Sequence, residues 1–166
     1  MANAIQNYRT KYEVKRQNRF YLIFPSDVGG DSLQASVVSS ARPNFEVSEI
    51  ELQHLNVRWW LSGKPNWSAW TCDFYDYLTD NTLQQMLKWY TKVYDIQTTK
   101  MSTPDNYKKD VVIQMLGPEL EGDVVEQYKL FGAWPKTIDL GALNMTSEGT
   151  ECHLGVTFRY DYAQLL

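Results

Sequence analysis

Residues 54–67 read HLNVRWWLSGKPNW and place two adjacent tryptophans, Trp59 and Trp60, in a run of strand-forming residues. Successive side chains of a strand point to opposite faces, so a sheet with one buried face cannot bury both indoles. If one ring enters the core, the other points outward, and covering it contributes roughly 2–3 kcal/mol. We therefore expect another protein chain to cover it. The alternative is that the pair straddles a turn and both rings lie in one core.

The composition fits a subunit that is surrounded by other chains. Aromatic residues make up 14% of the 166 residues, and large aromatic side chains are enriched in the buried centres of interfaces. The length suits a single domain with one hydrophobic core. The formal net charge of −4 argues against a dedicated nucleic-acid binder, because neutralising phosphates needs a basic surface.

Targeting signals are absent from the sequence pattern. No apolar run approaches the roughly 20 residues that a membrane span needs. Residues 1–17 lack the apolar centre of a secretory signal. We therefore expect no membrane partner, and we expect the chain to fold in the cytoplasm.

Cys72 and Cys152 are too few and too far apart for a disulfide framework or a zinc motif. Each alternates with apolar neighbours, so we expect both to be small buried side chains. A disulfide within or between subunits stays open as an alternative, although a reducing compartment does not favour it.

The chain divides into an N-terminal arm, residues 1–18, and a single domain, residues 19–166. The arm is polar and without clean periodicity. Its cations are candidate contacts with neighbouring subunits: Arg9, Lys11, Lys15 and Arg16. Short predicted strands follow at residues 19–24, 33–40, 47–53, 56–61 and 68–75, and the breaks between them are marked by Pro25, Gly29 with Gly30, Pro43 and Gly63.

One segment has helical periodicity and predicts an α-helix over about residues 81–95, with Thr79 or Asp80 as N-cap. The apolar stripe consists of Leu83, Met86, Leu87, Tyr90, Val93 and Tyr94. Such a stripe is the core face of a helix far more often than a binding groove.

Further strands are predicted at residues 111–116 and 124–131, and the clearest strand ends the chain. In TECHLGVTFRYDY, residues 150–162, every second residue is apolar or aromatic: Cys152, Leu154, Val156, Phe158, Tyr160 and Tyr162. Alternation of this length predicts one buried and one hydrated face.

The sequence has no catalytic signature. His54 and His153 lie far apart, and the motifs of serine hydrolases, zinc proteases and phosphate-binding loops are missing. Carboxylates at Glu119, Glu121 and Asp123 fall in a Gly/Pro turn, where solvated loop residues are the ordinary interpretation. We predict no catalytic residues, no metal site and no cofactor, and therefore not an enzyme.

Two stretches carry a family pattern. In the first, a strand with Val57 and Arg58 leads to Ser62-Gly63-Lys64-Pro65, an aromatic residue at Trp67 and a strand at residues 70–74. The second is a turn, LFGAWP at residues 130–135, followed by the closing strand. Spread over roughly residues 19–162, this pattern resembles the tail tube proteins of contractile-tailed bacteriophages, a fold family that includes the Hcp tube proteins of type VI secretion. The chain departs from the pattern in its more basic arm and its doubled tryptophan.

The resemblance implies a mainly β fold, a sandwich-like β-barrel with one flanking helix, which assembles into hexameric rings. The rings would stack into the inner tail tube of a virion, through which DNA is ejected without specific binding. The implied partners are further copies of the chain and the tail sheath, baseplate, tail terminator and tape measure proteins. Besides the arm cations, the candidate interface residues are Trp59, Trp60, Leu61, Gly63, Lys64 and Pro65.

The segment EVSEIELQ, residues 46–53, supplies a candidate channel wall. Ile50 and Leu52 share one strand face, so packing them inward would turn Glu49 and Glu51 away from the core. We expect these carboxylates to face the lumen, where they would repel phosphate; an outer solvated face is the alternative.

Three other functions fit parts of the sequence. A type VI Hcp-like tube and a baseplate protein that initiates the tube share the expected fold. A carbohydrate-binding β-sandwich would use an exposed Trp59 or Trp60 as a platform for a sugar ring.

Overall fold

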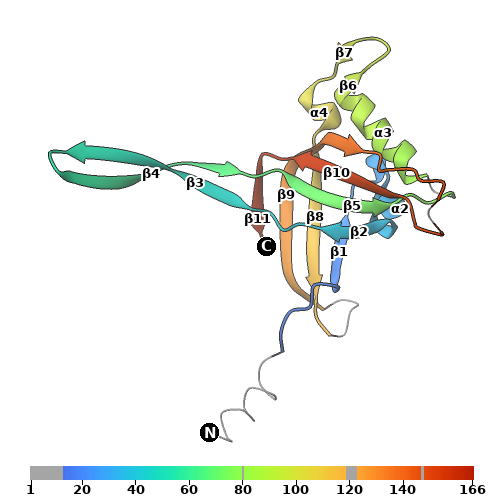
Figure 1. Ribbon diagram of the computed structural model, residues 1–166, viewed down its shortest axis with the longest axis horizontal. Coiled ribbons are helices and arrows are strands. Elements are labelled where there is room, and N and C mark those ends of the chain that lie inside the picture. Colours follow the sequence, from blue (N-terminus) through green and yellow to red (C-terminus); the bar gives the residue numbers. More distant parts are fainter. Residues whose placement is uncertain (1–12, 80, 119–122, 147) are drawn as a thin grey trace, which may run out of the picture.

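The computed structural model describes residues 13–166 apart from 80, 119–122 and 147. Strands are the main secondary structure, and one long hairpin projects from the rest of the molecule (Figure 1). The strands are β1 Phe20–Ile23, β2 Val37–Ser40, β3 Phe45–His54, β4 Val57–Trp67, β5 Trp70–Tyr75, β6 Tyr94–Asp95, β7 Lys100–Met101, β8 Lys109–Leu116, β9 Val124–Asp139, β10 His153–Arg159 and β11 Tyr162–Leu165.

A single antiparallel sheet follows the order β1-β8-β9-β10-β5-β2, and β11 adds to β9. Strand β9 belongs to both halves of this sheet, because it pairs first with β8 and β11 and then with β10. The half that contains β10, β5 and β2 runs across the half that contains β1 and β8 (Figure 1). The sheet therefore folds over on itself and encloses a core.

The long β9 replaces the turn that was predicted at residues 130–135. Gly132 has φ = 65°, and the register against β8 shifts between Lys109 and Val111, opposite this point. A residue with positive φ allows an extra residue to bulge out, which bends the strand without ending its pairing. The Gly-x-Trp-Pro segment is thus a bend in a continuous strand, and the prediction of a turn was wrong.

The sheet is not a closed barrel. Strands β1 and β2 lie at the two ends of the strand order and do not pair with each other in the part of the chain that the structure describes. A cleft of about 850 Å³ lies between them, lined among others by Phe20, Val38 and Met115. The mainly β class is confirmed, and the closure expected of a barrel is absent.

The core is aromatic. Phe158 of β10 stacks on Trp70 of β5, with 4.8 Å between ring centroids, and lies 5.5 Å from Trp89. Phe24 packs against all three of these rings at 6.4 Å. The alternation predicted for the last strand is confirmed from Leu154 to Tyr160, whose apolar members are at most 3% exposed.

The predicted long helix is α3, Thr82–Val93. Its N-cap is Asn81, whose side chain accepts a hydrogen bond from the backbone N–H of Gln84, so the expected N-cap lay one or two residues too early. The buried face also differs from the predicted stripe. Trp89 is fully buried, whereas Leu87 is 41% exposed, because the helix packs against the core through the indole of Trp89.

Three short helical segments complete the fold: η1 Ser26–Val28, α2 Gly30–Ala35 and α4 Pro104–Tyr107. Helix α2 occupies residues predicted as the start of a strand. Gly29 adopts φ = 122° at its N-cap, and Leu33 is fully buried against the core. Leu, Gln and Ala are good helix formers, and one buried side chain in a two-turn helix leaves no helical periodicity to detect.

The two cysteines differ. Cys72 is buried as predicted, but Cys152 is exposed, and both are free. Cys152 precedes the first residue of β10, so the alternation that buries Leu154 does not extend back to it. Burial raises the pKa of the Cys72 thiol far above its usual range.

Candidate assembly surface

The hairpin of β3 and β4 is the candidate functional surface. The two strands pair from Phe45↔Trp67 to His54↔Val57, and a two-residue turn with Leu55 at φ = 55° joins them. The hairpin forms its own two-stranded sheet and projects well away from the rest of the molecule (Figure 1). All ten residues of β3 are exposed. A projecting ribbon of this length has no subunit core to cover either of its faces.

Strand β4 runs through the residues that were predicted to break it. The register shifts between Val47 and Glu49, where Gly63 and Lys64 oppose the single residue Ser48. The Ser48 hydroxyl donates to the Lys64 carbonyl at 3.1 Å, and a Cβ at Gly63 would lie only 2.8 Å from the Ser48 backbone oxygen. Residues 62–65 therefore form a glycine-dependent bulge inside a continuous strand.

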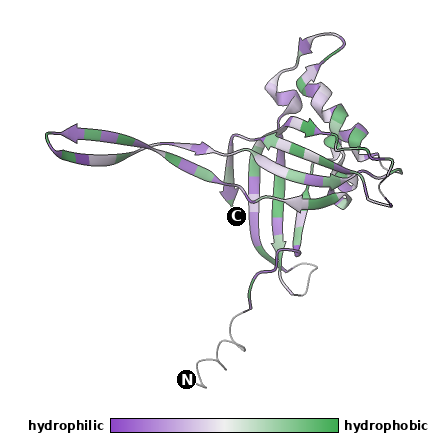
Figure 2. Ribbon diagram, viewed as in Figure 1, coloured by the Kyte–Doolittle hydropathy of each residue, from purple (hydrophilic) through white to green (hydrophobic). Residues whose placement is uncertain are grey.

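The apolar side of the hairpin changes face at this bulge. Between the bulge and the turn, directly paired residues place an apolar set on one face: Ile50, Leu52, Val57, Trp59 and Leu61. We call this set the tip face. Glu49, Glu51 and Gln53 lie on the opposite face with Trp60 and Arg58. Figure 2 shows hydrophobic and hydrophilic residues alternating along both strands.

Both tryptophans lie on the hairpin, and neither enters the core. Trp59 is 59% exposed and Trp60 is 58% exposed. They do point to opposite faces, as the strand geometry requires, but here both faces are open to solvent. The expectation that one indole is buried within the subunit was wrong, and so was the alternative that both share one core. Two open faces leave two tryptophans to be covered.

Between the bulge and the body, the apolar side lies on the other face and packs on the subunit. Phe45 lies 5.0 Å from Trp67, which lies 5.9 Å from Tyr160 of the body. Beside them, Arg159 donates to the Asn66 side chain at 3.3 Å. These contacts fix the root of the hairpin, so that the tip face is held in position and not on a loose loop.

Of the two candidate lumen carboxylates, Glu51 forms an ion pair with Arg58 at 3.3 Å. Glu49 lies opposite Ser62 on the same face. Both point away from Ile50 and Leu52 as predicted, although these two apolar residues are themselves 49% and 44% exposed and do not pack inward. The carboxylates therefore lie on the polar face of the hairpin, not on the wall of the folded sheet.

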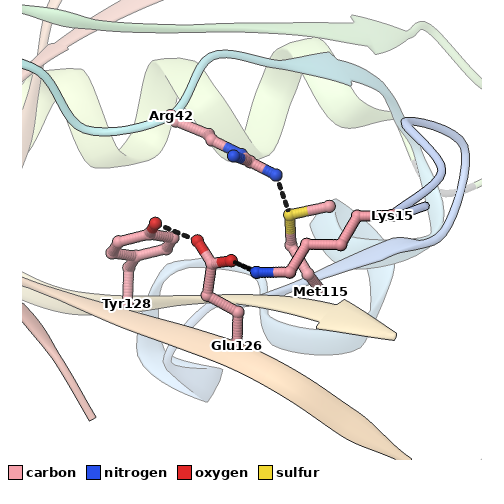
Figure 3. Close-up of polar contacts among 5 residues, drawn as sticks. All are labelled: Lys15, Arg42, Met115, Glu126 and Tyr128. Carbon is pink, nitrogen blue, oxygen red and sulfur yellow. Dashed lines mark hydrogen bonds and ion pairs between the residues drawn. The ribbon is translucent and has the colours of Figure 1, made fainter. Parts of the chain in front are cut away.

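The described part of the arm is attached to the body of the same chain. Lys15 pairs with the Glu126 carboxylate, which also accepts from the Tyr128 hydroxyl, and Arg42 contacts the sulfur of Met115 (Figure 3). Arg42 precedes the hairpin, so this cluster joins the arm and the hairpin root to β8 and β9. Arg16 is exposed, and the other two arm cations, Arg9 and Lys11, lie outside the described residues.

Replacing Glu126 by Gln should remove an acid-sensitive part of the stability. Lys15, followed by Tyr128, lowers the pKa of Glu126 below its usual value. A carboxyl whose folded pKa is lowered stabilises the fold above its unfolded pKa, near about 4.3, and this contribution is lost as the pH falls through the folded value. We expect Glu126→Gln to cost about 0.5–1 kcal/mol at pH 7 and close to nothing at about pH 2. Urea unfolding at both pH values measures this, and an equal cost at both would contradict it.

Other kinds of site find little support. No helix of the described residues is long and apolar enough to span a membrane. Among the same residues, no three His, Cys, Asp or Glu side chains come together as metal ligands. Two members of the tip face were not predicted from the sequence, because Ile50 and Leu52 were assigned to the core. The signal was present: apolar residues occupy odd positions at 45 and 47 and even positions at 50 and 52.

Comparison with known proteins gives matches in structure alone. No family model and no curated protein matches the sequence. A chain of the anti-feeding prophage cap, the tube terminating cap, has a TM-score of 0.73 at 15% identity, over 93% of this chain and 92% of that chain.

Two further matches come from an extracellular contractile injection system, PVC. A chain of its sheath/tube terminator has a TM-score of 0.71 at 14% identity, over 95% of this chain and 99% of that one. A chain of its sheath-tube complex has a TM-score of 0.65 at 14% identity, over 97% and 96%. At such identities the likeness establishes the fold, and it extends over nearly the whole of each chain.

Proposed function

We propose that this chain, which has the fold of the tube and tube-terminating proteins of contractile injection systems, is a structural subunit of the inner tube of a contractile tail. Hexameric rings of the chain stack into a hollow tube, and this tube serves as the conduit for phage DNA. The role is structural and not catalytic.

The exposed apolar tip face is the observation that supports this proposal most strongly. Its five members, from Ile50 to Leu61, are each 44–59% exposed and adjoin one another across the hairpin. Contiguous apolar surface of this kind is rare on monomers and marks protein interfaces. Among the described residues, β1 and β2 each leave one edge unpaired, whose backbone groups a neighbouring chain can cover, and a closed ring is a common way to cover both.

The proposed partners follow from this role. Copies of the chain meet within and between rings, through Trp59, Trp60, Leu61, Gly63, Lys64 and Pro65 of the hairpin and through the arm, residues 1–18. The tail sheath surrounds the tube, the baseplate and the tail terminator hold its ends, and the tape measure protein occupies the lumen. The chain assembles in the host cytoplasm, and its final location is the tail of the virion.

The proposal is tested by the mass of the purified chain as its concentration rises. Sedimentation and native mass spectrometry should show a species of six subunits and multiples of it, because rings form before they stack. A carbohydrate-binding sandwich would stay monomeric, and a monomer at all concentrations would refute the proposal.

A tube-terminating cap is the second candidate function. It is favoured because the two terminator matches, at TM-scores of 0.73 and 0.71, exceed the sheath-tube match at 0.65. A cap ends a tube and does not continue it. Rings that stay discrete at high concentration would favour the cap, and rings that elongate would favour the repeating subunit.

We also propose that Glu49 and Glu51 face the lumen in the assembled ring. Replacing both by lysine should leave ring formation nearly intact, because exposed charges contribute little to stability. Sixfold repetition of the new cations should make the tubes retain DNA at low salt and release it at high salt. Co-sedimentation with DNA fragments measures this. Tubes of the variant that bind DNA no better than the parent would place the polar face of the hairpin outside the lumen.

A further inference from the structure

The half-sheet of β2, β5, β10 and the second part of β9 carries two carboxylates on the face that points away from the core. Gly155 of β10 is paired with Asp73 of β5 on one side and with Asp139 of β9 on the other, so the three residues share this face. We call Asp73 and Asp139, with Gly155 between them, the aspartate pair. Two residues further along, three threonines are paired across the same strands: Thr71, Thr157 and Thr137. Short side chains thus leave both carboxylates accessible.

Gly155 keeps the space between the two carboxylates free of a side chain. A Cβ at Gly155 would lie 3.6 Å from the Cβ of Asp139 and 3.7 Å from Oδ1 of Asp73. The Ser39 hydroxyl donates to Asp73 Oδ2 at 2.6 Å. The backbone N–H of Gly141 donates to Asp139 Oδ1 at 3.0 Å. Within the described part of the chain, neither carboxylate has an ion-pair partner, and the second oxygen of each has no donor. A cation above Gly155 can therefore donate to both.

The cations that share this sheet face do not neutralise the aspartate pair. Arg159, four residues from Gly155 on β10, donates instead to Asn66 at the hairpin root at 3.3 Å. Lys136 lies at the bulge of β9 and forms no ion pair with any described residue. At the other end of these strands, Glu151 is exposed and adds a further negative charge. The aspartate pair is therefore open to a cation from another segment.

The N-terminal arm has the complementary charge. Residues 1–12, which lie outside the described residues, contain Arg9 and Lys11 and no carboxylate. Side chains two residues apart share one face of an extended segment, with their Cα atoms about 6.6–6.8 Å apart. Ammonium and guanidinium groups make strong, charge-assisted hydrogen bonds to carboxylates, and a guanidinium can donate to two oxygens at once.

The reach of the arm points to a second copy. Lys15 is paired with Glu126 near the start of β9, whereas Asp139 ends that strand. Strand β9 has 16 residues, so these two carboxylates lie roughly 30 Å apart even with the bend in the strand. Lys11 and Arg9 precede Lys15 by four and six residues. Extended chain of these lengths spans at most roughly 14 and 22 Å, so Lys11 falls short of the aspartate pair of its own copy.

We propose that the arm of one copy docks across the aspartate pair of a second copy and places Arg9 and Lys11 over its two carboxylates. This inference rests on the proposed function and names the surface that receives the arm. The giving and the receiving surfaces differ, so the contact is heterologous, and every copy both gives an arm and receives one. Charge pairs of this kind select the partner and fix its position.

Two pairs of substitutions test the contact. Asp73→Asn with Asp139→Asn removes both charges and keeps both hydrogen-bond acceptors, so the fold should be unchanged. Arg9→Gln with Lys11→Gln removes the cations of the arm. Sedimentation over a range of concentrations should show assembly about tenfold weaker for each pair at low salt. All four substitutions together should cost little more than either pair, because both pairs remove the same contact. At about 1 M salt the differences should fall within about twofold.

Asp31→Asn with Asp105→Asn is the matched control, since it removes two exposed carboxylates from α2 and α4. It should change assembly by less than about twofold. Losses that add up, or a harmless aspartate variant, in a chain that still forms rings would overturn the docking and leave the proposed function standing. A loss from the aspartate variant without one from the arm variant would overturn the arm as occupant. A parent chain that never assembles would overturn both proposals.

A second readout uses the native chain. A carbodiimide condenses the amine of Lys11 with a carboxyl group to an amide and takes up the released water as a urea. In rings assembled from a mixture of ¹⁴N- and ¹⁵N-labelled copies, mass spectrometry should find Lys11 joined to Asp73 or Asp139 in peptide pairs with one light and one heavy partner. Asp105 should yield about tenfold less product. Links within single copies only, or equal yields at Asp105, would overturn the proposal.

Discussion

Replacing Trp59 and Leu61 together by serine is expected to keep the chain monomeric at concentrations at which the parent assembles. Both side chains are about half exposed and belong to the tip face. Completing their burial in a contact is worth roughly 2–3 kcal/mol, so each contact should weaken about a hundredfold. A closed ring contains one such contact between each pair of neighbouring subunits, so the loss of binding free energy is repeated at every contact. Analytical ultracentrifugation of parent and variant measures the effect.

The monomeric variant should still be folded. Neither residue touches the core, so its free energy of unfolding should stay within about 0.5 kcal/mol of the parent. Trp60→Ser is the matched control, because Trp60 is 58% exposed but lies on the opposite face. It should weaken assembly less than Trp59→Ser. A double variant that assembles like the parent would remove the tip face from the interface.

Trp70→Ala should have the largest effect on stability. Trp70 is 1% exposed, stacks on Phe158 and donates from its indole N–H to the Ala41 carbonyl at 2.9 Å. Removing a buried indole leaves a cavity and costs about 3–5 kcal/mol. That is a large part of the stability of an ordinary domain, so much of the variant should be unfolded at 37 °C. Urea unfolding followed by circular dichroism gives the value.

Trp59→Ala is the control for this experiment, since it removes the same side chain from the hairpin. A loss below about 1 kcal/mol is expected there. Similar losses for the two tryptophans would mean that the hairpin and the body form one cooperative core, contrary to the projecting ribbon.

The sequence predicted the elements whose pattern reflects one buried face. Residues 154–160 alternate strictly because the strand has the core on one side and water on the other, and the structure confirms the strand. Helix α3 was predicted for the same reason, although its stripe was misplaced by the omission of Trp89. Tertiary packing buries Trp89 and leaves Leu87 exposed, and the periodicity of the sequence alone does not show which of the two is buried.

The hairpin was harder to predict because its apolar residues have no core within the chain. Ile50 and Leu52 alternate with charged residues as in any half-buried strand, so the pattern indicates an apolar face without saying which molecule covers it. The interpretation of Gly63 as a break failed similarly. A glycine in a strand pattern marks either a turn or a bulge, and the close approach to Ser48, which distinguishes them, depends on the partner strand.

Three hairpin residues, Trp59, Trp60 and Leu61, were thus named from the sequence as interface candidates, but the architecture of the hairpin was not predicted. Trp59 and Trp60 were assigned to an interface because they lie next to each other, yet the reason given, one ring in the core, was wrong.

The proposed structural role requires this chain to assemble into hollow rings. Negative-stain electron microscopy of the concentrated, purified chain tests it most directly. We expect top views with sixfold symmetry and a central hole, and side views in which rings either stack into tubes or remain single. Solid globular particles of monomer size, at concentrations well above those of the sedimentation experiments, would contradict it.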